Sequence, residues 1–198
     1  MDFTRHRRPS AFALLALAVA IMAAGVAGFL QEMRGGGLVL LARVTEHVVL
    51  LGWLTLAALL GALLLGLAKS VLRLVLCSVL LVLGIPFLLL VGLLSALAGP
   101  SEETKNLAAP GRDDRRLVVE EGAAMIDPLW YVYVHEGTWP LQRRWAVGRF
   151  NGDDPHNELR EAVWTAPDRI RLTTGEGEVH EVTLTPGGRP DRVVSAGW

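Results

Sequence analysis

Long apolar runs fill the first half of the chain. Residues 11–30 contain no charge, and as a helix rising about 1.5 Å per residue they match the ~30 Å thickness of a hydrocarbon core. Residues 48–99 contain only two charges, Lys69 and Arg73, and one helix of that length would be roughly 78 Å long. The chain must therefore turn near Lys69. We predict a transmembrane region of residues 11–98 with helices over about residues 11–30, 44–68 and 71–97.

The pattern changes after the last apolar run. Residues 99–114 are rich in Pro, Gly and polar residues without apolar periodicity, which predicts a linker. In residues 115–198, short β-favouring segments are separated by turn residues such as Asn151-Gly152 and Pro186-Gly187. We expect strands over residues 116–120, 129–136, 144–150, 158–165, 169–174, 179–185 and 192–196. The predicted fold class is a membrane protein with three transmembrane α-helices followed by a small, mostly antiparallel β-domain of six or seven strands, a sandwich or partly open barrel.

Charge divides the chain at the same place and indicates its orientation. Residues 1–100 carry seven Lys/Arg against three Asp/Glu, whereas residues 101–198 carry twelve against seventeen. The acidic second half lacks a basic stripe able to neutralise phosphates, which argues against a nucleic-acid partner. Three arginines lie in the basic segment of residues 1–10, directly before the first span. The positive-inside tendency then predicts a cytoplasmic N-terminus and, after three spans, an extracytoplasmic β-domain at the cell membrane.

The first apolar run carries two further signals. Small residues at 25–27 would suit a signal-peptide cleavage site, but the run is longer than a usual signal-peptide core, which favours a retained helix. Small residues also recur every four positions and form one smooth helix face, which another helix could approach closely. This predicted helix-packing face, within the protein or toward a partner, consists of Ala16, Ala20, Ala24 and Gly28.

An aromatic stretch, residues 125–140, stands out in the second half. Read as a strand, it places Trp130, Val132 and Val134 on one face, and Leu129, Tyr131, Tyr133 and His135 on the other. The first face is all apolar and is the better candidate for the core. The second has apolar bodies with polar tips, typical of a covered strand or a ligand-facing surface. The candidate binding residues are Trp130, Tyr131, Tyr133 and His135.

Histidines and acidic residues suggest an alternative, a metal site. Three imidazoles with a carboxylate could hold Zn²⁺ and leave a position open for water. The candidates lie on different predicted segments without a local metal motif, so turn and strand-end roles are favoured and no cofactor is predicted. The alternative ligands are His135, His156, His180, Asp153 and Asp154. The only cysteine, Cys77, lies inside a predicted span, so the chain cannot form an internal disulfide.

These observations favour a non-enzymatic protein. Three spans without buried charge suggest anchoring and assembly, and an acidic, aromatic-rich outer domain suggests recognition. The expected partners are the lipid bilayer and another membrane or extracytoplasmic protein, or a second copy of the chain. A metal-dependent enzyme using the three histidines is one alternative. A small channel or transporter subunit is the other, disfavoured by the lack of ionisable groups in the span cores.

Overall fold

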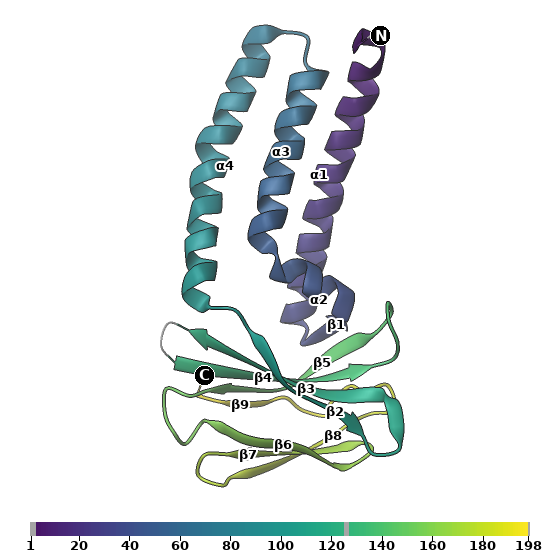
Figure 1. Ribbon diagram of the computed structural model, residues 1–198, viewed down its shortest axis with the longest axis vertical. Coiled ribbons are helices and arrows are strands. Elements are labelled where there is room, and N and C mark those ends of the chain that lie inside the picture. The colour runs from purple at the N-terminus through teal and green to yellow at the C-terminus, as the bar shows by residue number, and fades with distance from the viewer. Residues whose placement is uncertain (1–2, 125–126, 198) are drawn as a thin grey trace. The chain divides into compact units, whose positions relative to one another are not determined.

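The computed structural model describes residues 3–124 and 127–197 (Figure 1). The chain forms two compact units. A helical unit contains the chain up to Leu30 and again Arg43–Ser95, and a β-unit contains Gln31–Ala42 and the chain from Ala96 onward. The segment between the first two predicted spans therefore belongs to the β-unit, which sequence reasoning did not anticipate.

Three helices are long and apolar enough to cross a membrane, as the sequence predicts. The spans are Arg7–Met33, Val48–Gly66 and Ser70–Ala98, and they indicate a multi-pass membrane protein. The helices are α1 (Phe3–Met33), α2 (Val39–Glu46), α3 (Val48–Gly66) and α4 (Ser70–Ala98). The chain turns between Gly66 and Ser70, beside Lys69. The helix expected over residues 44–68 is divided at His47 into the short α2 and the spanning α3.

The helices contact each other where leucine side chains pack against glycine residues of a neighbouring helix. Leu56 of α3 lies against Gly84 of α4, and Leu88 of α4 lies against Gly52 of α3. Both leucines are buried, although most of the helical surface is exposed. On the other side of α3, Gly61 lies close to Leu14 of α1, where a Cβ would be 2.8 Å from Cδ1. The missing glycine side chains let the helices approach closely, as in other membrane bundles.

The β-unit consists of two sheets. The large sheet has the order β1-β5-β4-β3-β2, with antiparallel neighbours, and β9 pairs with β5 in parallel. The small sheet has the order β6-β7-β8 and is antiparallel. The strands are β1 (Gly36–Leu38), β2 (Glu102–Ala109), β3 (Arg112–Ala124), β4 (Asp127–Glu136), β5 (Arg143–Asn151), β6 (Leu159–Ala166), β7 (Arg169–Thr174), β8 (Val179–Thr183) and β9 (Val194–Ala196).

Two of these strands correct the sequence-based expectation. Residues 99–114 were expected to be a linker, but they contain β2 and the start of β3, with Asn106 opposite Val118 and Leu107 opposite Leu117. Nearly all of β2 is exposed, so it shows no alternation of apolar and polar residues and is held by backbone pairing. The other missed strand, β1, is Gly-Gly-Leu and has little β-propensity of its own. The unit thus has more than the six or seven strands expected.

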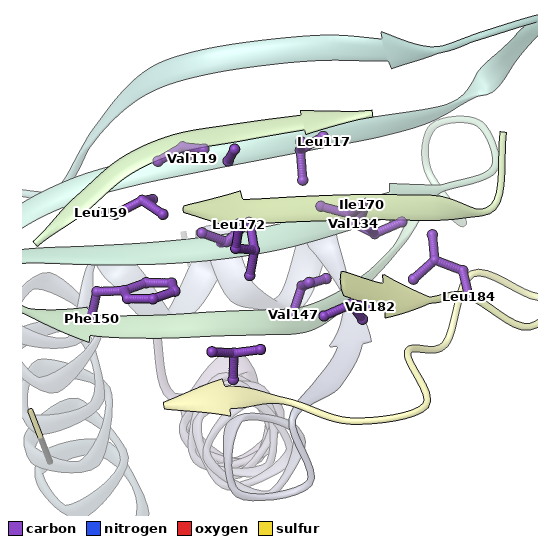
Figure 2. Packing of buried hydrophobic residues seen from close by; sticks show 13 residues of the cluster. Leu117, Val119, Val134, Val147, Phe150, Leu159, Ile170, Leu172, Val182 and Leu184 are labelled. Carbon is purple, nitrogen blue, oxygen red and sulfur yellow. The ribbon is translucent and has the colours of Figure 1, made fainter. Parts of the chain in front are cut away.

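The core lies between the two sheets. Figure 2 shows Val134, Val147 and Phe150 from the large sheet facing Ile170, Leu172 and Val182 of the small sheet. Val132 and Val134 are fully buried and Trp130 packs partly buried against this cluster. The sequence therefore identified the core face of β4 correctly.

A buried arginine joins the sheets at one edge of this core. Arg115 of β3 is 1% exposed and pairs with Glu136 of β4, which accepts hydrogen bonds from its Nε and Nη2. Its Nη1 donates to the carbonyl of Pro167 at 3.2 Å, and Nη2 also donates to the carbonyls of Thr185 at 3.3 Å and Pro186 at 2.9 Å. Pro167 lies in the turn before β7, and the other two carbonyls follow β8. Every nitrogen of the guanidinium therefore has a hydrogen-bond acceptor, which offsets the cost of burying the charge.

Candidate functional site

The candidate site is the face of the large sheet opposite the core. Tyr131, Tyr133 and His135 lie on this face, whereas Trp130 lies on the core side. Tyr133 and His135 are 5% and 8% exposed, and Tyr131 is half-buried. The structure thus brings three of the four predicted binding residues onto one face and covers two of them.

A cluster of charged groups lies on this face, with one arginine directly over the Tyr133 ring. The guanidinium carbon of Arg144 lies 4.5 Å from the centre of the Tyr133 ring, a cation–π contact. Arg144 donates from Nη2 to Glu32 at 2.7 Å, and its Nη1 lies 4.0 Å from a Glu120 carboxylate oxygen. Arg149, opposite Tyr131 in the β4–β5 register, reaches the other oxygen of Glu32 at 3.4 Å. Two arginines and two carboxylates balance each other in this arginine–glutamate cluster.

Glu32 comes from an unusual position, the last turn of α1. A carboxylate is unfavourable at a helix C-terminus, because the helix dipole places partial negative charge there. The two arginines of β5 compensate for that placement. Sequence reasoning missed this residue, although an acidic side chain at the end of an uncharged run was a usable signal.

The segment after Glu32 is fixed to the sheet by its backbone. Gly35 has a φ of 69°, which favours glycine and ends α1 with a hydrogen bond from its N–H to the Glu32 carbonyl. Its carbonyl accepts from the Ala146 N–H at 2.8 Å. Gln31 accepts from the Leu38 N–H at 2.7 Å through its side chain, and Val39 N–H donates to the Gln142 carbonyl at 2.9 Å. The inter-span segment is therefore an ordered part of the β-unit.

Burial controls the ionisation of the two tyrosines. The pKa of Tyr133 is raised well above its usual value, chiefly because burial disfavours the charged phenolate. Burial also raises the pKa of Tyr131, with nearby Arg149 acting in the opposite direction. Neither phenol is therefore ionised at physiological pH, and both can pack against the charged groups beside them.

The histidines of the alternative metal site lie on different elements. His135 is on β4, His180 is on β8, and His156 is in the connection between β5 and β6. His156 contacts Asp154 at 3.4 Å and Glu176 at 2.8 Å, while His180 lies 3.5 Å from Glu178. In the described ranges, no group of three or more His, Cys, Asp and Glu side chains is placed to hold a metal ion.

The loop that carries these acidic candidates follows ordinary turn chemistry. The Asp153 N–H donates to the Asn151 side chain at 3.2 Å, and the His156 N–H donates to Asp154 at 3.0 Å. None of these contacts brings Asp153 to His135 or His180.

The predicted small-residue face of α1 is divided by the structure. Gly28 is buried and lies against Thr45, whereas Ala16 and Ala20 are exposed and Ala24 is intermediate. The buried positions Ala11 and Ala18 lie on another side of the helix, because successive residues turn by about 100°. The exposed alanines are therefore not used in packing within the helical unit.

Comparison with known proteins gives no assignment: no protein-family profile, curated protein or solved structure matches the chain. The candidate site is therefore interpreted from its own geometry.

Removing the charge of Glu32 is expected to weaken the β-unit. In Glu32→Gln, Arg144, whose side chain is 16% exposed, loses its closest counter-charge. We expect the free energy of unfolding to fall by about 1–2 kcal/mol, because breaking a partly buried pair costs more than breaking an exposed one. Denaturant unfolding of the full chain in detergent, followed by tryptophan fluorescence, measures this change. The control is Glu181→Gln, whose pair with Arg171 is about half exposed and should cost under ~0.5 kcal/mol. Equal losses in the two variants would contradict a specific role for Glu32.

The two tyrosines predict the alkaline behaviour of the fold. Tyr131 and Tyr133 are the only tyrosines, so tyrosinate absorbance reports this face alone. Their folded-state pKa values are raised, so their contribution to stability is complete below an unfolded pKa of about 10 and is lost as the pH rises through the folded values. We expect both to titrate late in the folded protein, Tyr133 last, and Tyr133→Phe to make stability fall less steeply above about pH 10. Joint titration near the ordinary tyrosine value while the chain stays folded would disprove this.

Proposed function

We propose that the chain is a non-enzymatic, membrane-anchored interaction module whose β-unit lies outside the cytoplasm and binds another protein in or on the same membrane. The observation that carries this proposal is that Gln31–Ala42, between two spans, is part of the β-unit. The chain therefore passes between the β-unit and the helical unit three times. A domain attached so often, with short connections, is confined to the membrane surface. Its partners must reach it there.

The chain connections agree with three crossings. The segment after the first span and the segment after the third span lie on the same side of a membrane when all three helices cross it. The β-unit contains both segments, as this arrangement requires. The arginines at positions 5, 7 and 8 before the first span favour a cytoplasmic N-terminus, which puts the β-unit on the extracytoplasmic side of the cell membrane.

The surface of the spans supports membership of a larger assembly. Ala16 and Ala20 remain exposed on α1, and a smooth alanine surface allows close approach of another helix. The β-unit also exposes apolar side chains that are not part of the arginine–glutamate cluster, with Val179 53% and Val193 48% exposed. A partner that contacts the β-unit and inserts a helix in the bilayer would use both surfaces.

The orientation is tested by cysteine labelling in intact cells, with Cys77 replaced by Ser. A cysteine at Gly187, whose added side chain meets no neighbouring atom within 4 Å, should react with a membrane-impermeant reagent. A cysteine at Ser70, the exposed first residue of α4, should react only after the cells are permeabilised. The reverse pattern would place the β-unit in the cytoplasm.

The partner is tested by photo-crosslinking of the full chain in native membranes. A photoreactive residue at Leu107, Val179 or Val193, all exposed on the β-unit, should give a discrete protein adduct at one or more positions. Val26 of α1, which is 59% exposed, is the control position and should give lipid adducts. An adduct of twice the chain mass would identify a second copy as the partner. Failure of every β-unit position to capture protein would refute the interaction function.

A further inference from the structure

The loop between β4 and β5 exposes two large apolar side chains that are separated in the sequence by one proline. Trp139 is 59% exposed and Leu141 is 75% exposed, and among the large apolar residues of the described β-unit only Met33, at 72%, reaches a comparable exposure. The core of the same unit is complete without them. Exposed apolar area is unfavourable in water at about 25 cal/mol per Å², so a paired exposure at one loop tip points to a surface that covers it.

The loop is held in a defined conformation at both of its ends. At the start, the Gly137 N–H donates to the Asp114 carbonyl at 2.8 Å. At the end, the Gln142 carbonyl accepts from the Val39 N–H at 2.9 Å, and the Gln142 side chain reaches the Gly137 carbonyl at 3.5 Å. The two apolar side chains are thus presented from a closed, ordered loop.

The same hydrogen bonds connect this loop to the chain that enters the membrane. Val39 belongs to the segment between two spans, and Leu38 lies opposite Arg143, the first residue of β5. Gly35, bonded to Ala146 of β5, is two residues beyond Met33, where the first span ends. Arg34 and Gly35 form a turn, so they cover less than the ~7 Å of two fully extended residues. That length does not exceed the headgroup layer, which adds roughly 5–7 Å on each side of the hydrocarbon core.

The chemistry of the loop suits that layer. Tryptophan is enriched at membrane interfaces because its ring is apolar while its N–H still finds a polar partner. Arg143 directly follows the loop and Arg34 lies in the paired inter-span segment, and both side chains are exposed. Exposed arginines can donate to lipid phosphates. Leu40, 39% exposed at the start of α2, adds apolar surface to the same segment.

We propose that Trp139 and Leu141 insert into the headgroup region of the bilayer that the helices cross, so that the loop is a second, peripheral membrane contact of the β-unit. The contact would attach the β-unit to the membrane at a point other than its three chain connections to the helical unit. The inference does not depend on a protein partner. It requires only that the three helices span the bilayer.

The test places a fluorophore sensitive to polarity on the loop. The full chain carrying Leu141→Cys and Cys77→Ser is labelled with the fluorophore at position 141. It is then reconstituted into vesicles of equal parts phosphatidylcholine and phosphatidylglycerol. We expect blue-shifted emission, with more than half of it lost when some lipids carry a nitroxide at the headgroup. The matched control is Val179→Cys on β8, an exposed apolar residue of the same unit, which should keep the emission of a label in water.

Two outcomes would overturn the proposal. Emission of the Leu141→Cys label equal to that of the Val179→Cys label would show that the loop stays in water. A blue shift without nitroxide quenching would show that protein, not lipid, covers the loop. A second variant adds Trp139→Ser to Leu141→Cys and should reduce the quenching, because one of the two inserted side chains is removed; unchanged quenching also counts against insertion of Trp139.

Discussion

The antiparallel pairing of Gly36–Leu38 with the start of β5 is the constraint on which the other features depend. It converts a loop between two membrane spans into a strand of the β-unit. Glu32, at the end of α1, is thereby brought to Arg144 and Arg149, and the Tyr133 ring is covered. The pairing also requires that this loop and the C-terminal half of the chain share one side of the membrane.

Two charge clusters carry out different tasks in the β-unit. Arg115 is buried between the sheets, and its hydrogen bonds to Glu136 and three carbonyls fix turns of the small sheet against the large one. The arginine–glutamate cluster lies on the other face of the large sheet and holds the inter-span segment. In both clusters, one planar guanidinium group interacts with several acceptors at once. A lysine ammonium group could not do this with the same geometry.

The sequence predicts those parts that depend on local composition. The three spans, the turn beside Lys69 and the core face of Trp130, Val132 and Val134 follow from apolar patterns and were correct. The strand β1 could not be found, because it is stabilised by backbone pairing with β5, more than a hundred residues later. The strand β2 pairs with the adjacent β3, but nearly all of it is exposed, so it lacks the alternation of apolar and polar residues that marks a strand. The placement of Tyr133 and His135 on one face follows from strand periodicity. The covering of the Tyr133 ring does not, because Arg144, which lies over it, is held by Glu32, 112 positions earlier in the chain.

The pairing of β1 with β5 also has a consequence for the order of biosynthesis. Arg144 follows Glu32 by 112 residues, so the second and third spans must be made before the partner strand exists. Contacts between such distant segments form late, because the closure of a long loop has an entropic cost. During this interval the edge of the nascent first loop is open to wrong pairing. Its length of only three residues, with two glycines, limits that risk, since so short an edge offers little template for another chain.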